Sequence, residues 1–305
     1  LGFRAIRSGE ADVAIACGAE NMGNVCHLVE AKSGRWGKRL GHIQMVDILF
    51  ELGYGKKGFN PVALDAGDVS LEFEIDRAEQ DNWGLRSQER WAAAYENGKY
   101  KVGEEIMALE IPQRKSDPIV FDRDEPPRKT SLEKLAKLRT IYGSPTVTAG
   151  NAPGMNAGGS AMVIMSRKKA DKLGLEPLAT IETMAWDAAE PKYMSTLPAK
   201  AIKKALSNIN KDIDDLDLIE INEAFAAVTL VSLKALAEMD AHKYNALQEI
   251  TNVNGGAIAI GHPVGASGAR ITMTLMYELM RRGGGCGVAA ICGGLGQGES
   301  IILQV

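Results

Sequence analysis

The chain lacks the cysteine spacings that mark zinc sites and disulfide scaffolds. Its 305 residues include four cysteines, and no two of them form a CxxC pair. We therefore predict neither a metal site nor a disulfide framework. Free thiols fit a reducing compartment, so a cytoplasmic protein is expected. The four cysteines are Cys17, Cys26, Cys286 and Cys292.

Charge blocks and long apolar runs are also missing. The 35 Lys and Arg residues and 39 Asp and Glu residues give a formal net charge of -4. No basic cluster stands out, so a nucleic-acid partner is not expected. No apolar run approaches the roughly 20 residues that cross a bilayer, and no signal-peptide pattern opens the chain. A membrane partner is therefore not expected either.

The chain does not open on methionine. Leu1–Arg7 is typical of the last turns of a helix, with Ser8-Gly9 as the C-cap. We therefore expect a preceding segment that was removed or that lies outside these residues. The Gly-rich stretch 148–159 has neither a Walker lysine nor a dinucleotide fingerprint. It is interpreted as backbone that approaches a ligand or another segment.

What is present is ordinary globular composition, 45% hydrophobic and 24% charged, and the length suggests two domains. Residues 24–146 are richer in charge and aromatics than their surroundings. Helices are predicted there at 45–52 and 76–95, together with a turn-prone acidic segment at 122–128. We interpret this region as an insertion that covers something.

Outside the insertion, strands and helices alternate. Such alternation predicts a mainly parallel sheet covered by helices. The first strand, at 12–17, is expected to be short, buried and ended by Gly18. Further strands are predicted at 160–166, 179–184, 216–221, 287–292 and 300–304, and helices at 167–173, 199–207, 223–239 and 265–282.

A short internal echo supports two similar halves. Residues 7–19 align without gaps on residues 282–294, so that Cys17 falls on Cys292 and Gly18 on Gly293. Each copy is a helix end, a glycine-containing turn and a strand that ends in Cys-Gly. A match of this length can arise by chance, but the shared helix-turn-strand context favours duplication.

Three residues could carry chemistry. His262 lies in a loop of small residues that leads into a helix, and a near-neutral imidazole suits a general base. Cys292 ends an apolar strand beside Gly293-Gly294, whose bare amides could face an oxyanion. Its thiol could act as acid, base or nucleophile. Asn222 joins a strand to a helix, where it could be a simple N-cap or could bind a water or an oxyanion.

Together these strings resemble the thiolase family, the CoA-dependent enzymes that make or cleave 3-ketoacyl-CoA. The resemblance covers the whole chain. The motifs that carry it are Asn222-Glu-Ala-Phe, the loop from Asn254-Gly-Gly through Gly261-His-Pro to Gly265-Ala-Ser-Gly-Ala-Arg, and Cys292-Gly-Gly-Leu-Gly, with support from Thr148-Ala-Gly-Asn and Ala16-Cys-Gly-Ala-Glu-Asn-Met.

The resemblance implies an α/β fold, with two βαβαβαββ halves in five αβαβα layers and an inserted loop domain. The first half would span residues 1–175, including the loop domain at about 24–146, and the second residues 176–305. It also implies a homo-oligomer, a dimer or a tetramer. Coenzyme A would be a substrate, and no cofactor would be bound permanently.

The resemblance also implies roles for single residues. His262 would be the base that activates an acylated cysteine, and Cys292 the second cysteine, which moves a proton to or from the reacting carbon. Asn222 would be the water-holding member of the thioester oxyanion hole that it shares with His262, and the amide of Gly294 would belong to a second oxyanion hole. The positions that resemble the CoA pocket are Arg128, Leu138, Tyr142, Ala149, Ala224 and Phe225.

Three departures from the family pattern matter. The Cys-x-Ser-Gly motif of the acylated cysteine does not occur in the chain. The nucleophile is therefore expected from an N-terminal segment or a partner polypeptide outside these residues, and neither Cys17 nor Cys26 is expected to replace it. Pro153 stands where a serine often meets the pantetheine, and Pro61-Val-Ala replaces the usual His-Met-Gly, so CoA contacts are expected to differ.

The leading hypothesis is an acyl-CoA:acetyl-CoA C-acyltransferase that works by ping-pong covalent catalysis. A ketoacyl synthase would want a second catalytic histidine and a Phe-Gly-Phe-Gly-Gly-like ending, and neither is found. A non-catalytic thiolase-like subunit or CoA-binding scaffold is the other alternative. The absent nucleophile favours that alternative, whereas His262, Cys292 and Asn222 argue against it.

Overall fold

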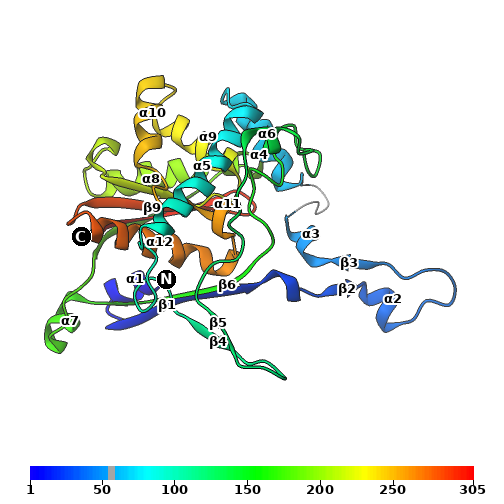
Figure 1. Cartoon of the computed structure of the whole chain (residues 1–305), viewed down its shortest axis with the longest axis horizontal. Coiled ribbons are helices and arrows are strands. Elements are labelled where there is room, and N and C mark those ends of the chain that lie inside the picture. Colours follow the sequence, from blue (N-terminus) through cyan, green and yellow to red (C-terminus); the bar gives the residue numbers. More distant parts are fainter. Residues whose placement is uncertain (54–58) are drawn as a thin grey trace.

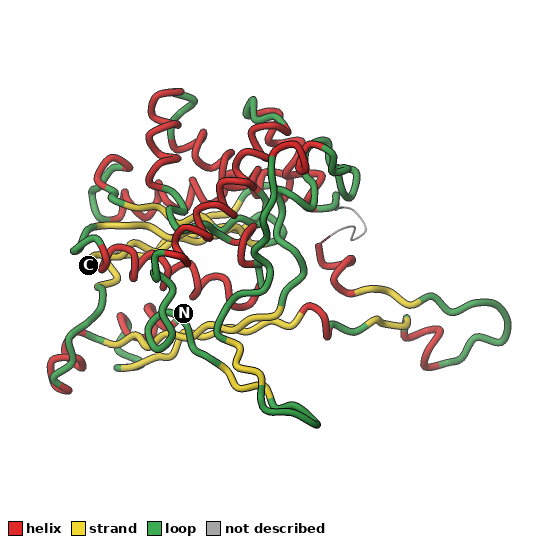
Figure 2. The backbone as a smooth tube through the Cα atoms, viewed as in Figure 1, coloured by secondary structure: helices red, strands yellow, loops and turns green. Residues whose placement is uncertain are grey.

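The centre of the architecture is helix α12 (Val264–Arg281), which lies between two sheets (Figure 1). The computed structural model describes residues 1–53 and 59–305. Below α12 in the figure lies a sheet of two strands, and above it a sheet of four. Helices α8 (Leu197–Asn208) and α9 (Ala226–Leu236) cover the far side of the larger sheet. Figure 2 shows the same alternation of helical and strand layers.

The four-stranded sheet has the order β7-β10-β9-β8. Only β8 and β9 run parallel, and β10 is antiparallel to both of its neighbours. The prediction of a mainly parallel sheet is therefore wrong. The reason is a tight reversal after β9, in which Leu295 and Gly296 adopt positive φ angles of 60° and 78° and return the chain directly. The strands are β7 (Thr180–Ala188), β8 (Leu218–Ile221), β9 (Cys286–Gly293) and β10 (Gln297–Gln304).

The smaller sheet pairs β1 (Val13–Asn21) with β6 (Ala157–Met165) in antiparallel register. The prediction of a short buried strand that ends at Gly18 is wrong, because β1 runs through Gly18 and alternates between exposed and half-buried residues. Position 18, inside the strand, is a glycine because α12 packs so closely against β1 that a β-carbon there would overlap the carbonyl oxygen of Gly265. The glycine therefore marks a close backbone approach.

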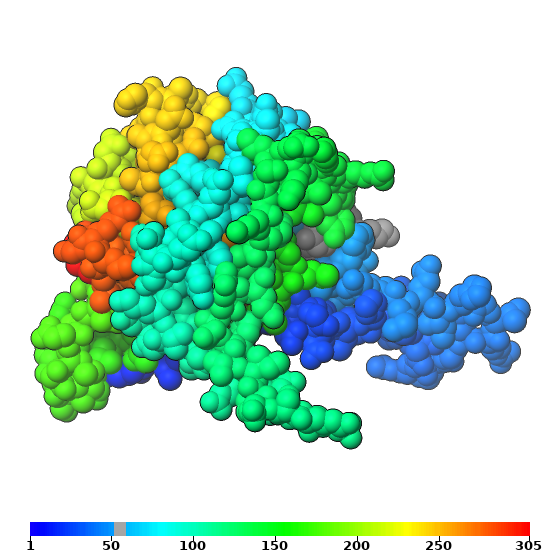
Figure 3. Space-filling view, in the orientation of Figure 1, coloured from blue at the N-terminus to red at the C-terminus, as the bar shows by residue number. Residues whose placement is uncertain are grey.

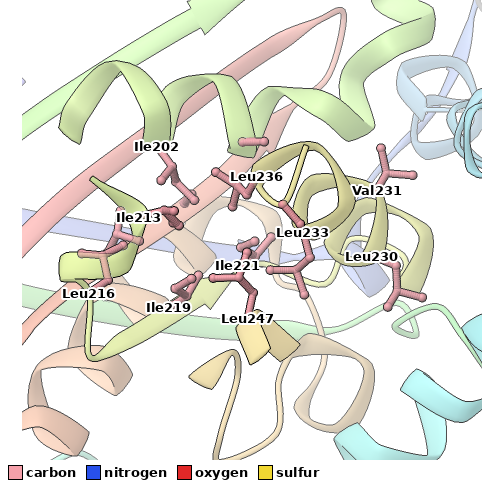
Figure 4. Close-up of a cluster of buried hydrophobic side chains, with 14 of the residues drawn as sticks. Ile202, Ile213, Leu216, Ile219, Ile221, Leu230, Val231, Leu233, Leu236 and Leu247 are labelled. Carbon is pink, nitrogen blue, oxygen red and sulfur yellow. The ribbon is translucent and has the colours of Figure 1, made fainter. Parts of the chain in front are cut away.

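The main hydrophobic core is aliphatic and lies between the four-stranded sheet and the helices above it (Figure 4). Ile219 and Ile221 of β8 meet Leu230 and Leu233 of α9, and all four are at most 1% exposed. Residues of α8 and of α10 (Ala241–Ile250) close the cluster. Burying such side chains stabilises the fold by about 1.5–3 kcal/mol each.

The inserted region combines packed helices with two projections. Helices α4 (Val62–Glu72), α5 (Arg77–Glu96) and α6 (Leu132–Ala136) pack on the body, and α5 begins where the Asp76 carboxylate accepts the amide of Glu79 at 2.8 Å. An arm and a hairpin extend away from the body (Figure 3). The arm holds β2 (His27–Val29), α2 (Ala31–Arg35), β3 (Met45–Asp47) and α3 (Ile48–Gly53), and the hairpin holds β4 (Leu109–Ile111) and β5 (Ile119–Phe121).

One predicted boundary in this region is displaced. The helix expected at 45–52 begins as strand β3, because residues 45–47 pair with residues 27–29, and it becomes helical only at Ile48. The remaining short elements are α1 (Gly2–Arg7), α7 (Arg167–Leu173), α11 (Ala257–Ile260) and the 3-10 turns Met22–Asn24, Pro191–Thr196 and Ile213–Asp215. In the part of the chain that is described, no helix has both the length and the apolar character to cross a membrane.

Near its C-terminal end, α12 is tied to the insertion through one buried carboxylate. Glu278 is 4% exposed and accepts hydrogen bonds from Lys99, Asn254, Arg281 and Arg282 at 2.9–3.2 Å. Burial by itself would raise the pKa of Glu278, but these four donors outweigh it and lower the pKa to about 2. The ionised carboxylate thus stabilises the folded state.

Replacing this carboxylate should weaken the fold in a pH-dependent way. We expect Glu278→Gln to lower the free energy of unfolding by about 1–3 kcal/mol at pH 7. The folded pKa of about 2 lies below the ordinary 4.5, so the stabilisation is present above pH 4.5 and is lost as the pH falls towards 2. Urea unfolding at pH 7 and pH 3 tests this, and a deficit that is equal at both values would contradict it.

Candidate active site

Two of the predicted residues lie at the same edge of the larger sheet. Asn222 directly follows β8, and Cys292 is the next-to-last residue of β9. The two strands are parallel, with Ile221 opposite Ala290, and the amide of Asn222 donates to the carbonyl of Ala290 at 2.9 Å. Parallel strands place their carboxyl ends together, which is where α/β proteins bind ligands.

His262 reaches this edge on a loop between α11 and α12. Gly261 before it has a φ of 97°, and a β-carbon there would overlap the side chain of Asn156. The amide of His262 donates to Asn156 Oδ1 at 3.0 Å. Pro263 after it packs over Gly158 at the start of β6. The smaller sheet therefore holds the loop in place, and only glycine fits at position 261.

The imidazole of His262 has a hydrogen-bond partner on each nitrogen. Nδ1 lies 2.6 Å from Ser267 Oγ, and Nε2 lies 3.3 Å from Nδ2, the side-chain amide nitrogen of Asn222. Ser267 Oγ in turn donates to the carbonyl oxygen of Pro263 at 3.0 Å. Because that carbonyl can only accept, the hydroxyl proton is used there, and Ser267 Oγ must accept from Nδ1–H. Nε2 then carries the free lone pair, the form that a base requires.

Burial keeps both titratable groups of the site uncharged. Removal from water, and to a smaller extent the positive charge of Arg270, together lower the pKa of His262 to about 4. Burial raises the pKa of the Cys292 thiol to about 12. At neutral pH the site thus contains a neutral imidazole and a protonated thiol.

Cys292 lies in apolar surroundings, and Gly294 lies at their open end. The thiol is 7% exposed and belongs to a cluster with Phe225, Val147 and Met194, against which Ala224 packs. No side-chain hydrogen bond joins Cys292 to His262 within the described residues. Gly294 follows β9, is exposed, and has open space where a side chain would be.

The candidate CoA-binding residues form one connected group with one outlier. Arg128 donates to the carbonyl of Ala149 at 2.9 Å, and Leu138 packs on the adjoining Gly150. The carbonyl of Asn151 accepts from the amide of Ala226 at 2.9 Å, which places this group beside Ala224 and Phe225. Tyr142 lies at a left-handed position (φ 52°), with its ring 6.2 Å from that of Phe50.

Several supporting residues were not singled out from the sequence. Asn156, Ser267 and Arg270 surround His262 and Asn222, and the last two lie inside the motif that contains His262. Position within that motif was the one available signal. Asp81 accepts from Asn151 at 2.9 Å and pairs with Arg77 at 2.8 Å, which fixes the loop that carries Ala149. Nothing in the sequence near 77–81 indicates this role.

Glu223 is also structural support. Its carboxylate is 1% exposed and accepts from Trp83, Ser87, Asn252 and the amide of Ile258 at 2.7–3.0 Å. This carboxylate therefore clamps helix α5 and the start of α11 to the segment that follows Asn222. A buried charge with this many donors is compensated.

The described residues contain no group of three or more His, Cys, Asp or Glu side chains placed to hold a metal ion. The free cysteines divide by location: Cys17 and Cys26 are exposed, whereas Cys286 and Cys292 are buried. The half-buried imidazole of His262 and the buried thiol of Cys292, at the ends of two parallel strands, form a candidate enzyme site for acid–base chemistry in an α/β fold.

Comparison with known proteins assigns the family. Residues 1–168 match the family model of the thiolase N-terminal domain, and residues 175–305 that of the thiolase C-terminal domain. An acetyl-CoA acetyltransferase from Chromobacterium violaceum is 42% identical over 308 residues, covering 100% of this chain and 75% of that protein. The chain belongs to the thiolase family, and it is an acyltransferase of thiolase type.

Solved structures agree on the fold. The acetyl-CoA acetyltransferase of Bacillus anthracis is 38% identical and superposes with a TM-score of 0.89, covering 98% of this chain and 73% of that one. Human mitochondrial 3-ketoacyl-CoA thiolase in complex with CoA is 37% identical with a TM-score of 0.87, covering 99% and 75%. The α/β thiolase fold expected from the sequence motifs is therefore confirmed.

The deduced imidazole tautomer can be tested by removing its acceptor. In Ser267→Ala the Nδ1 proton loses its partner, so we expect the fraction of Nδ1-protonated His262 to fall. The ¹⁵N shifts of the two ring nitrogens measure this fraction. Ser160→Ala is the matched control, because Ser160 Oγ donates to the carbonyl of Ala266 at 2.6 Å and does not contact the imidazole. Equal tautomer ratios in both variants would argue against the assignment.

Proposed function

We propose that this chain is an acyl-CoA:acetyl-CoA C-acyltransferase that cleaves 3-ketoacyl-CoA with CoA or condenses two acetyl-CoA molecules. The observation that carries the proposal is the meeting of His262 and Asn222, 3.3 Å apart, at the sheet edge where the buried Cys292 thiol also lies. A neutral base, a protonated acid and amide donors are the groups that this reaction needs. The nucleophilic cysteine would come from outside residues 1–305.

In the cleavage direction, His262 Nε2 would take the proton of the nucleophilic thiol. The thiolate attacks the 3-keto carbon, and the resulting tetrahedral oxyanion collapses with breakage of the C2–C3 bond. The electron pair is left on C2 of the departing acetyl-CoA. The Cys292 thiol gives its proton to that carbon, so acetyl-CoA leaves and an acyl thioester remains on the nucleophile.

In the second half-reaction, the Cys292 thiolate would take the proton of the incoming CoA thiol. The CoA thiolate attacks the acyl thioester, and the nucleophile leaves as a thiolate that regains its proton from His262. A pKa of about 12 makes the Cys292 thiolate a strong base once it has given up its proton, which favours this return step. Both residues thereby end each cycle in their neutral forms.

Each oxyanion would be stabilised by hydrogen-bond donors. The side-chain NH₂ group of Asn222, together with His262 Nε2–H once it has taken the thiol proton, would donate to one oxyanion, and the backbone amide of Gly294 would donate to the other. Donors fixed in a water-poor site stabilise developing charge more than donors in water. Removing one such donor typically costs 10²–10³ in rate, on the order of 3–4 kcal/mol.

We further propose that CoA binds along the group formed by Arg128, Leu138, Ala149, Ala224 and Phe225, with Tyr142 nearby. The CoA complex of the 37% identical human thiolase supports CoA as substrate. Arg128 can pair with a phosphate, while Leu138 and Phe225 can contact the pantetheine. We also propose a homo-oligomer, and a partner polypeptide is one possible source of the nucleophile.

Covalent catalysis predicts an acyl-enzyme. After the complete native assembly is mixed with acetyl-CoA, intact-mass measurement should show one added acetyl group of about 42 Da on a cysteine-containing chain. Iodoacetamide treatment beforehand is the control, because it blocks the thiol and should remove the adduct. If no chain of the assembly gains the acetyl group, the scaffold alternative is favoured and the proposal fails.

The separate roles of Cys292 and His262 predict different losses in two assays. Exchange of the acetyl group between acetyl-CoA and labelled CoA forms no carbanion, and in that reaction His262 can pass the proton between the nucleophile and the CoA thiol, whereas condensation also needs Cys292 to take a proton from carbon. We expect Cys292→Ala to lose condensation by about 10²–10⁴-fold and to keep a larger share of exchange. His262→Ala should lose both activities. Equal losses of both activities in Cys292→Ala would refute its assignment as the acid–base partner of the reacting carbon.

A further inference from the structure

Arg270 reaches from the middle of α12 to the strand end that carries Asn222. Its Nη2 lies 3.4 Å from Asn222 Oδ1, and its Nη1 lies 4.0 Å from Glu220 Oε2 on β8. The Arg270 side chain is 19% exposed and that of Glu220 is 4% exposed. The guanidinium thus contacts two residues of the same strand segment from behind the site.

This contact fixes which way the Asn222 amide faces. A guanidinium has only donors, so the atom of Asn222 that faces it must be the oxygen. The NH₂ group must then point the opposite way, where His262 Nε2 lies 3.3 Å from it. Because Ser267 and Pro263 leave Nε2 unprotonated, the NH₂ group meets a lone pair. In the series of contacts that runs from Arg270 through Asn222, His262 and Ser267 to the Pro263 carbonyl, every donor therefore meets an acceptor.

We propose that Arg270 is a positioning residue of this site, which holds the Asn222 amide with its NH₂ group towards His262 and the reacting carbonyl. The inference rests on the proposed function, because the amide is useful only if an oxyanion forms there. Without the guanidinium, the amide could rotate and present its oxygen to the oxyanion, which would repel it. Arg270 does not itself touch the position of the substrate carbonyl.

The charge of Arg270 supports the same assignment. Around the guanidinium lie buried acids and a phenol, and the imidazole of His262 also senses its charge. Burial and the Arg270 charge together lower the pKa of His262, which keeps its lone pair available. The groups that face this charge are Glu220, Glu105, Asp124, Tyr100 and His262.

A structural role alone would make different predictions. If Arg270 served only to pair with Glu220, its loss would lower stability and leave the imidazole and the turnover of folded enzyme unchanged. Glu220 Oε2 has no hydrogen-bond partner in the described structure, and 4.0 Å is long for an ion pair. The shorter contact of the guanidinium is the one to Asn222.

The experiment uses Arg270→Met, Arg270→Gln and Arg270→Lys in the complete active assembly, with Arg281→Met as matched control. Arg281 lies on the same helix, is similarly covered at 24% exposed, and pairs with Glu278 instead of Asn222. Two quantities are measured: the His262 pKa, from the pH dependence of its imidazole NMR signals, and kcat and KM for acetyl-CoA in the CoA-exchange assay. The signal of His262 is identified among those of the four histidines as the one that is missing from the spectrum of His262→Asn.

For Arg270→Met we expect kcat to fall about 10–100-fold, because a misplaced donor costs this much. KM should stay within about threefold. The His262 pKa should rise from about 4 but stay below the ordinary 6.5, since the positive charge is gone while the burial, the larger cause, remains. Arg270→Lys should leave the pKa low. Arg270→Gln should raise the pKa but retain more turnover than Arg270→Met, because its NH₂ can still donate to Asn222. Arg281→Met should change kcat by no more than about twofold and should leave the His262 pKa unchanged.

Unchanged His262 titration and unchanged kcat in folded Arg270→Met would overturn the inference. Should that variant not fold, Arg270→Gln against Arg270→Lys decides by the same two quantities. If the parent assembly shows no acyl transfer but the pKa shift is present, the proposed function fails while the contact between Arg270 and the site stands. If the parent is active and none of the Arg270 variants differs from Arg281→Met, the function stands and the inference fails.

Discussion

The pairing of β8 with β9 is the constraint on which the site depends. It is the parallel pairing within the larger sheet, and it brings Asn222 and Cys292 to one edge although 70 positions separate them in the sequence. The hydrogen bond from the Asn222 amide to Ala290 fixes the relative height of the two strands. A slip of one residue in β9 would turn every side chain of that strand, Cys292 included, to the other face of the sheet.

The second requirement is a rigid support for His262. The histidine lies on a loop, and loops are usually the more mobile parts of a fold. Here the loop is held between the smaller sheet and α12 by close contacts that tolerate only glycine: the backbone of Gly265 lies against Gly18, and the side chain of Asn156 lies against Gly261. Ser267, on the first turns of α12, then orients the ring. The helix that joins the two sheets is therefore also the element that aligns the base.

A single physical effect prepares both titratable groups. Desolvation disfavours charge, so it lowers the pKa of an imidazole and raises that of a thiol. The proposed chemistry needs this combination, because a protonated histidine could not accept a proton and a thiolate could not supply one. In the proposed mechanism, the apolar cluster around Cys292 would therefore serve catalysis as well as stability.

Local sequence patterns determined much of the fold. Helices α5, α8 and α12 were predicted to within a few residues, because their apolar spacing and capping residues are local features. Strand directions were not predictable in this way: the alternation of strands and helices suggested a mainly parallel sheet, but the tight turn through Leu295 and Gly296 makes β10 antiparallel to β9. The end of β1 was misplaced because Gly18 is read locally as a stop, whereas its reason is the distant Gly265.

The sequence by itself determined the α/β family and the identity of the candidate base, thiol and amide, because these residues lie in short motifs of glycine and polar residues. The contacts that hold these residues in place were decided by the tertiary structure alone. Asn156, Ser267 and Arg270 gain their roles from contacts with residues up to 106 positions away in the chain, and no local pattern encodes such a contact. Burial, which sets the protonation of His262 and Cys292, likewise exists only once the layers have packed around them.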